Sequence, residues 1–263
     1  METSLSPPKW YDRLWAALMF FTRIPLWRLY QPPRTAYESV VEYWPLAGWI
    51  TGGVMAGVLY GTSFVFSMPV AVVLAIVSRL LLTGALHEDG LADFFDGFGG
   101  GTSRQRILDI MKDSHIGTYG VLALVAYMAL LFFALSAMPP GVAALTIMAV
   151  DPYAKMLGAQ VVQMMPYART AETAKNQTVY RKISVTAAIG LAFQGLTPIA
   201  IYLWWMAGNV DWEFVIFAPC LVMYFLYLFI WRKLRGYTGD CCGALFLLTE
   251  LSTYLVVSIY FTQ

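Results

Sequence analysis

Residues 119–137 read YGVLALVAYMALLFFALSA, a run without a single charged side chain. A helix rises about 1.5 Å per residue, so about 20 apolar residues cross a hydrocarbon core of about 30 Å. The run is therefore predicted to be a transmembrane helix. The whole chain of 263 residues is 59% hydrophobic and 13% charged, whereas ordinary soluble domains carry about 25% charged residues. This composition predicts an integral membrane protein.

Six further segments of similar character lie on both sides of this run. The sequence has no repeated strand-length alternation of the kind that a membrane β-barrel needs, so helices are the expected spans. The predicted fold class is all-α, a polytopic transmembrane helical bundle with about seven spans, at residues 47–67, 68–86, 119–137, 141–165, 184–207, 213–231 and 243–261. No internal repeat or linker divides the sequence, so residues 1–263 are expected to form a single integral membrane domain.

The segment 10–27 differs from these spans. Its uncharged run, 14–22, is too short to cross a bilayer, and Trp10 and Trp27 lie at its ends. This pattern predicts an N-terminal interfacial amphipathic helix, with a tilted eighth span as the alternative. Residues 1–9 are polar and no small-residue cleavage site follows them, so we expect no cleaved signal peptide.

Lysine and arginine residues gather in alternate connections between the predicted spans. The connections 67–69, 138–140 and 208–212 contain none, whereas several lie in each of 28–44, 87–118, 166–183 and 232–242. The positive-inside rule places the charged connections, including an acidic active-site loop at 87–118, in the cytoplasm. The net charge of +1 gives no basic excess of the kind that favours nucleic-acid binding.

The stretch 86–101 reads LHEDGLADFFDGFGGG. Asp89, Asp93 and Asp96 are spaced i, i+4, i+7, so on a helix they share one face. Oxygen ligands suit a hard cation, and Mg²⁺ takes a few carboxylates, waters and substrate phosphates. We therefore expect these three residues to be metal ligands. The alternative is a solvated acidic loop. The apolar residues among the carboxylates argue against it, because a solvated loop would be polar throughout.

A second charged block, RQRILDIMKDSHIGTYG, occupies residues 104–120. The candidates for phosphate or metal chemistry in it are Arg104, Arg106, Lys112 and Asp113. A local salt bridge to Asp109 explains Arg106 equally well. His87 and His115, the only histidines, flank the acidic loop and are further site candidates, although a lone histidine is more often structural.

The last charged connection includes Thr238-Gly239-Asp240, just ahead of a predicted span. A glycine-framed turn at a helix N-terminus presents N–H groups to an anion, and Asp240 is placed to bind metal or simply to cap the helix. The adjacent Cys241 and Cys242 form no CxxC motif with each other or with Cys220, so we expect neither a zinc site nor a disulfide framework.

Together these motifs resemble cobalamin synthase, the adenosylcobinamide-GDP ribazoletransferase family. The resemblance extends over most of the chain and rests on residues 21–25, 44–48, 83–93, 96–97, 110–120 and 238–240. The HEDGLADFFDG and MKDSHIGT blocks, in this order, are its most specific part. Glu88 departs from the hydrophobic residue that the family commonly has at this place.

The resemblance implies Mg²⁺-dependent transfer of the adenosylcobinamide phosphate group from adenosylcobinamide-GDP to α-ribazole or α-ribazole 5′-phosphate. GMP would be released, and adenosylcobalamin or its 5′-phosphate would form, late in cobalamin biosynthesis. It also implies location in the plasma (inner) membrane of a prokaryote. Expected partners are the substrates, the lipid bilayer, and either a second copy of the chain or other late enzymes of the pathway.

Roles for individual residues are expectations on the same basis. Asp89, Asp93 and Asp96 would hold Mg²⁺ on the pyrophosphate of the activated corrinoid. The residues expected to be catalytic are Asp113, as proton acceptor or further metal ligand, His87, orienting a carboxylate, and Lys112 and Arg106, stabilising charge. The residues expected to bind substrate are Arg104, His115, Thr238, Gly239 and Asp240.

Two other functions fit parts of the sequence. Membrane phosphotransferases of the CDP-alcohol type also use aspartates four residues apart, but their motif continues into Ala-Arg, and no Ala-Arg follows the aspartates here. A transporter would use the charged residues inside the predicted spans as an ion pathway: Asp151 and Lys155, an i, i+4 pair, and Arg79 and Glu250, which have no partner evident in the sequence. Transporters often have matched halves, and the sequence shows none.

Overall fold

The computed structural model describes residues 8–169 and 179–262, and its regular structure there is entirely helical. The elements are α1 (Trp10–Phe21), the 3-10 segments η1 (Leu26–Arg28) and η2 (Arg34–Tyr43), α2 (Trp44–Ser63), α3 (Met68–Thr83), α4 (Leu86–Gly100), α5 (Arg104–Lys112), α6 (Thr118–Ser136), α7 (Pro140–Met164), α8 (Val185–Trp205), α9 (Trp212–Leu234) and α10 (Gly239–Ile259). An all-α fold, as the sequence predicts, is confirmed.

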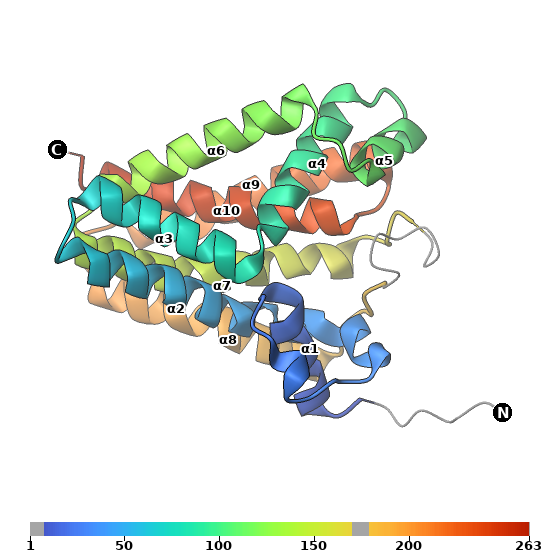
Figure 1. Cartoon of the computed structure of the whole chain (residues 1–263), viewed down its shortest axis with the longest axis horizontal. Coiled ribbons are helices and arrows are strands. Elements are labelled where there is room, and N and C mark those ends of the chain that lie inside the picture. Colours follow the sequence, from blue (N-terminus) through green and yellow to red (C-terminus); the bar gives the residue numbers. More distant parts are fainter. Residues whose placement is uncertain (1–7, 170–178, 263) are drawn as a thin grey trace.

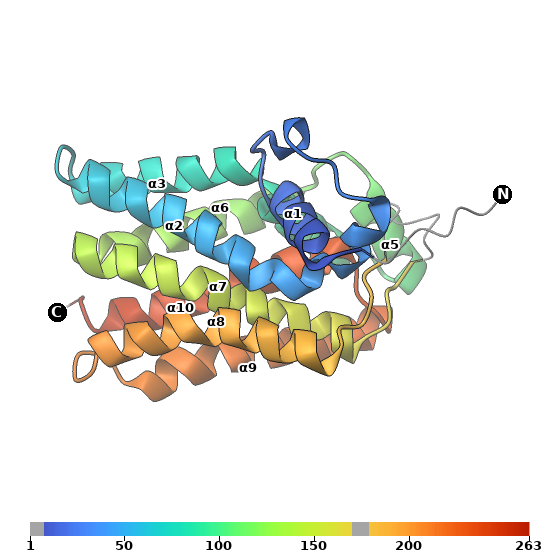
Figure 2. The ribbon, with the colours of Figure 1, turned by 90° about the horizontal axis from the view of Figure 1, so that it is seen from below.

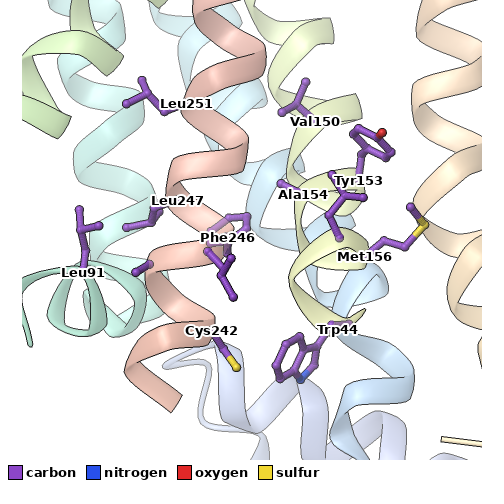
Figure 3. Packing of buried hydrophobic residues seen from close by; sticks show 14 of the residues in the cluster. Trp44, Leu91, Val150, Tyr153, Ala154, Met156, Cys242, Phe246, Leu247 and Leu251 are labelled. Carbon is purple, nitrogen blue, oxygen red and sulfur yellow. The ribbon is translucent and has the colours of Figure 1, made fainter. Parts of the chain in front are cut away.

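The long helices run between two ends of an elongated bundle (Figures 1 and 2). Helices α7 and α10 lie at its centre, where 78% and 72% of their most apolar windows are buried. Helices α6, α8 and α9 lie outside this central pair, and only 17% to 28% of their most apolar windows is buried. Leu247 and Leu251 of α10 and Val150 and Ala154 of α7 belong to the packed core between the helices (Figure 3).

Each of the seven predicted spans lies mainly in one long helix: α2, α3, α6, α7, α8, α9 and α10. Five of these, α6 to α10, are long and apolar enough to cross a membrane. A sixth span results if α3 and α4, which meet at an angle of 89°, are counted together. Helix α2 is long enough but less apolar, and α3 alone has only 16 residues. The count of seven stays a prediction.

The charged connections and α1 gather at one end of the bundle, and the short turns lie with the C-terminus at the other (Figures 1 and 2). Part of one charged connection, residues 170–178, is outside the described residues. The separation agrees with the alternating charge pattern of the sequence. Which end faces the cytoplasm stays a prediction based on the positive-inside rule.

The predicted acidic loop at 87–118 is mostly helical, which corrects its description as a loop: it contains α4 and α5. Between α3 and α4, Gly84 and Ala85 both have left-handed backbone conformations, with φ of 64° and 56°. A side chain on Gly84 would also meet Arg23, because a Cβ there would lie 2.1 Å from its Nε. The bend therefore needs glycine at position 84, and it turns α4 toward the start of α6 (Figure 1).

The N-terminal segment forms a shorter helix than predicted, because α1 ends at Phe21. At about 1.5 Å per residue, its 12 residues cannot cross a bilayer. The alternative of a tilted eighth span is therefore wrong. Arg13 of α1 donates to Glu42 of η2 over 2.8 Å, which ties the helix to the rest of the charged end. Its location in the membrane interface stays a prediction.

Charged residues inside the bundle pair with one another. Lys155 and Asp151 form the predicted i, i+4 ion pair, and Thr51 Oγ1 donates to Asp151 over 2.8 Å. Arg79 donates to both oxygens of Glu250, over 2.8 and 2.7 Å. The first pair lies within α7 and is linked to α2 through Thr51, and the second connects α3 with α10. Each buried charge thus has a partner of opposite sign, which accounts for the four residues without an ion pathway.

Candidate functional site

A cavity of about 1050 Å³ lies at the charged end of the bundle. Its walls come from α1, η2 and the beginnings of α2, α4 and α10, together with the end of α7 and the connection that follows it. These elements are far apart in the sequence. Of the residues expected to be in the site, those that line the cavity are His87, Asp89, Thr238, Gly239 and Asp240.

Two carboxylates reach this cavity from different helices, Asp89 from α4 and Asp240 from α10. The helices approach closely here: a Cβ on Gly90 would lie 3.2 Å from the Cα of Asp240, and a Cβ on Gly243 would lie 3.2 Å from the His87 carbonyl oxygen. Thr238 fixes the start of α10, since its Oγ1 accepts from the backbone N–H of Cys241. The glycine contact thus brings both carboxylates to one cavity.

Positive side chains also line the cavity: Arg23, Arg34, Lys155 and Arg169. Sequence reasoning did not assign them to the site. Arg23 lies within the block 21–25 that carries the family resemblance, and this signal could have identified it. Arg169 is held in place by donating to the backbone oxygen of Leu108 over 2.6 Å. Positive charge beside two carboxylates suits a ligand with phosphate groups.

His87 lies among aromatic side chains, and its Nε2 is buried without a hydrogen-bond partner in the described part of the chain. Its ring stacks on Phe21, with centroids 5.5 Å apart, and lies 4.5 Å from Phe246. The Nζ of Lys155 lies 3.7 Å from the centroid of the Phe246 ring. The role predicted for His87, orienting a carboxylate, stays a prediction.

Asp96 lies in the second half of α4 and is not among the residues that line the cavity. Its two carboxylate oxygens accept from the backbone N–H groups of Gly117 and Gly120, over 2.6 and 2.8 Å. Both donors belong to the start of α6, so Asp96 anchors that helix N-terminus. Asp93, between Asp89 and Asp96, is partly buried and does not line the cavity either. Metal binding by Asp93 and Asp96 stays a prediction.

The candidates on and after α5 lie on the surface, outside the cavity lining: Arg104, Arg106, Lys112, Asp113 and His115. Arg104 ties α5 to its neighbours by donating to the backbone oxygens of Leu234 and Ala168, over 2.8 and 2.7 Å. Asp109 accepts from Gln105 rather than from Arg106. The predicted local salt bridge is therefore absent within the described ranges.

Asp113 and His115 contact each other. The His115 ring nitrogen Nδ1 lies 2.7 Å from Asp113 Oδ1, and the His115 backbone N–H donates to the same oxygen over 3.0 Å. These hydrogen bonds lower the pKa of the Asp113 carboxyl below its ordinary value. A lowered pKa makes a carboxylate a weaker base, so this geometry does not favour proton abstraction by Asp113.

The cavity carboxylates fit a magnesium ion in their chemistry. Asp89 and Asp240 offer oxygen donors only, and Mg²⁺ binds through one or two carboxylates together with waters and substrate phosphates. Within residues 8–169 and 179–262, no group of three or more His, Cys, Asp or Glu side chains is arranged to hold a metal ion. A metal ion held by Asp89 and Asp240 would thus take its remaining ligands from water and from substrate phosphates, as Mg²⁺ commonly does.

Known proteins match nearly the whole chain. A family model described as cobalamin-5-phosphate synthase matches residues 13–258. A relative from Shewanella amazonensis is 37% identical over 94% of this chain and 95% of its own length. A relative from Leptospira interrogans is 30% identical over 95% and 96%. Both relatives are named adenosylcobinamide-GDP ribazoletransferase. No solved structure matches the chain.

Proposed function

The chain belongs to the cobalamin-5-phosphate synthase family, and from this premise we propose that the cavity between α4 and α10 is its active site. The protein is an enzyme of cobalamin biosynthesis, a transferase like its named relatives. The observation that carries the proposal is the pair of carboxylates, Asp89 and Asp240, that the contact of Gly90 with α10 brings to one cavity among positive side chains.

The proposed reaction transfers a phosphate group between two oxygens. A ribose hydroxyl of α-ribazole, or of its 5′-phosphate, attacks the phosphorus atom attached to the corrinoid of adenosylcobinamide-GDP. A P–O bond forms there, the bond from that phosphorus to the bridging oxygen breaks, and GMP leaves with the bridging oxygen. The hydroxyl proton passes to water or to a carboxylate at the cavity.

Asp89 and Asp240 are the residues that would hold Mg²⁺. When bound, this ion neutralises charge on the phosphate oxygens and aligns the attacking and leaving oxygens. Arg23, Arg34 and Arg169 line the same cavity. Their guanidinium groups would orient the pyrophosphate, because arginine binds phosphate oxygens through two parallel N–H groups.

The cavity is proposed to face the cytoplasm of a prokaryotic inner membrane, because the positively charged connections lie at its end of the bundle. One assay tests both the reaction and the orientation. Inside-out vesicles that contain the protein should release GMP from adenosylcobinamide-GDP with α-ribazole and Mg²⁺, and a chelator should stop the release. Right-side-out vesicles should release GMP only after detergent opens them, because the substrates cannot otherwise reach the cytoplasmic face. Purified protein that releases no GMP under these conditions would contradict the reaction, and activity in intact right-side-out vesicles would contradict only the orientation.

A further inference from the structure

A continuous row of aromatic rings forms one wall of the cavity, and the proposed phosphate chemistry at Asp89 and Asp240 does not use it. Trp44 meets Tyr180 edge to face at 5.6 Å and Phe21 at 5.8 Å. The row continues through His87 to Phe246, as described above, and all five rings line the cavity. Figure 3 shows Trp44 and Cys242 at one end of the packed core, with Phe246 further along α10 toward its middle.

Three polar atoms in or beside this row are buried without a hydrogen-bond partner in the described structure: Trp44 Nε1, His87 Nε2 and Thr35 Oγ1. Trp44 and His87 are only 4% and 5% exposed, and Thr35 also lines the cavity. A buried polar group without a partner is costly, and such groups are rare in native proteins unless they have a function. Three at one cavity wall indicate that a ligand completes the site.

We propose that this wall binds the aromatic heterocyclic base of a nucleotide or nucleoside substrate. This inference rests on the proposed function, in which two substrates carry such a base: guanine in adenosylcobinamide-GDP and the base of α-ribazole. A flat heterocycle stacks on aromatic faces and presents ring nitrogens or carbonyl oxygens at its edge. The Trp44 N–H and the Thr35 hydroxyl would then donate to acceptors in the plane of the base.

Other ligand chemistries match the wall less well. A lipid tail would leave the Trp44 and Thr35 polar atoms unpaired, at the same energetic cost as in the free protein. A phosphate group would be drawn to the guanidinium groups and to a metal held by the carboxylates. A base is the part of the substrates that combines a flat apolar surface with hydrogen-bonding atoms at its edge.

The 3-10 segment η2 offers a route for the base to reach these atoms. Thr35 lies in η2, and Trp44 follows its last residue. The segment runs for 10 residues, whereas 3-10 helices seldom exceed about four residues because their hydrogen bonds are poorly aligned. Because Trp44 Nε1 and Thr35 Oγ1 are both buried, the proposal requires this segment to shift when the base binds.

Trp44→Phe and Thr35→Val test the proposal, because each keeps most of the side chain and removes the hydrogen-bonding group. The KM for adenosylcobinamide-GDP and the KM for α-ribazole are measured separately with Mg²⁺ present. We expect the KM for one of the two substrates to rise about tenfold, as for one lost hydrogen bond, with kcat nearly unchanged. Which KM rises identifies the base.

The matched control is Trp15→Phe. Trp15 Nε1 is also buried without a partner in the described structure, but Trp15 does not line the cavity. Its KM values should equal those of the wild type. The melting temperature of Thr35→Val, which keeps the shape of the side chain, should be equal to or above that of the wild type, because an unsatisfied polar group is removed. A KM unchanged for both substrates, or raised for both, would overturn the proposal.

Direct binding keeps this inference separate from the proposed function. Calorimetric titration with GMP and with α-ribazole does not require turnover. One of the two should bind the wild type about tenfold more tightly than Trp44→Phe. If the wild type releases no GMP but this difference is found, the proposed reaction fails and the base site stands. If GMP is released but neither ligand distinguishes the two proteins, the base site fails alone.

Discussion

Helix α4 carries aspartates at helical spacing along its length, but its two halves have different surroundings. The first half lies against α10 through Gly90, and Asp89 faces the cavity. The second half lies against the start of α6, where both oxygens of Asp96 accept backbone N–H groups. Residues on a shared helical face therefore need not share a role, because the role of each carboxylate depends on the groups that the neighbouring helix places beside it.

The largest effect is expected in the first half of α4. Asp89→Asn keeps the size of the side chain and removes its charge, so the GMP release rate should fall about 100-fold or more if the carboxylate holds Mg²⁺. Asp240→Asn should behave alike, and the double variant should lose little more, since one metal site is lost only once. Rates against Mg²⁺ concentration provide the measurement. Rates like the wild type in Asp89→Asn would remove the central claim of the proposed mechanism.

In the second half, the effect should be on stability. Asp96→Ala leaves the backbone N–H groups of Gly117 and Gly120 without their acceptor, so the free energy of unfolding should fall by about 2–4 kcal/mol. Denaturation in detergent measures it. The protein that remains folded should keep the KM values of the wild type. A folded variant with normal stability and no Mg²⁺-dependent activity would instead establish Asp96 as a metal ligand.

A pair of glycines seven positions apart gives a smaller and sharper contrast. In Gly90→Ala the new Cβ meets the backbone of Asp240, at 3.2 Å from its Cα and 3.3 Å from its oxygen. Helix α4 must then move away from α10, and activity should fall about tenfold, because small misplacements of reacting groups are costly. In Gly97→Ala the new Cβ meets the Met111 side chain at 2.7 Å and the Ile107 backbone oxygen at 3.2 Å, both on α5, whose residues do not line the cavity.

Because these contacts lie on α5, away from the cavity, any shift that they cause leaves Asp89 and Asp240 in place, and Gly97→Ala should keep its activity. The helix propensity of alanine offsets part of any strain in both variants. Rates and melting temperatures of the two proteins, measured side by side, provide the comparison. Equal losses of activity would show that the two halves of α4 are not functionally distinct.

The smallest effect on activity is expected at Asp113, which follows α5 and belongs to neither half of α4. Its pKa is lowered by hydrogen bonds from His115, so its contribution to stability is present above its ordinary pKa and is lost as the pH falls below about 4. Asp113→Asn should flatten this acid dependence of the melting temperature. Near pH 7 its GMP release should stay within about twofold of the wild type, as for exposed pairs of charges. A loss of about 100-fold would support the catalytic role predicted from the sequence.

The helical segments could be predicted because apolarity is a local property of the sequence. The aspartate spacing in 86–101 already indicated a helix within the segment described as a loop. The burial of Leu91 and Phe94 in that helix could not be predicted, because it depends on distant helices. The pairing of Arg79 with Glu250 also had no sequence signal, because the two residues lie 171 positions apart.

The sequence by itself determined the membrane class, the helical segments, the charged end and the family, because each depends on residue types at local spacing. Only the tertiary structure decided that Asp89 and Asp240 line the same cavity, that Asp96 anchors α6, and that Trp44 lies in a row of aromatic rings. The physical reason is that helical spacing sets the direction of a side chain relative to its own helix. What that side chain contacts depends on the packing of other helices, here through glycine contacts that allow α4 and α10 to approach closely.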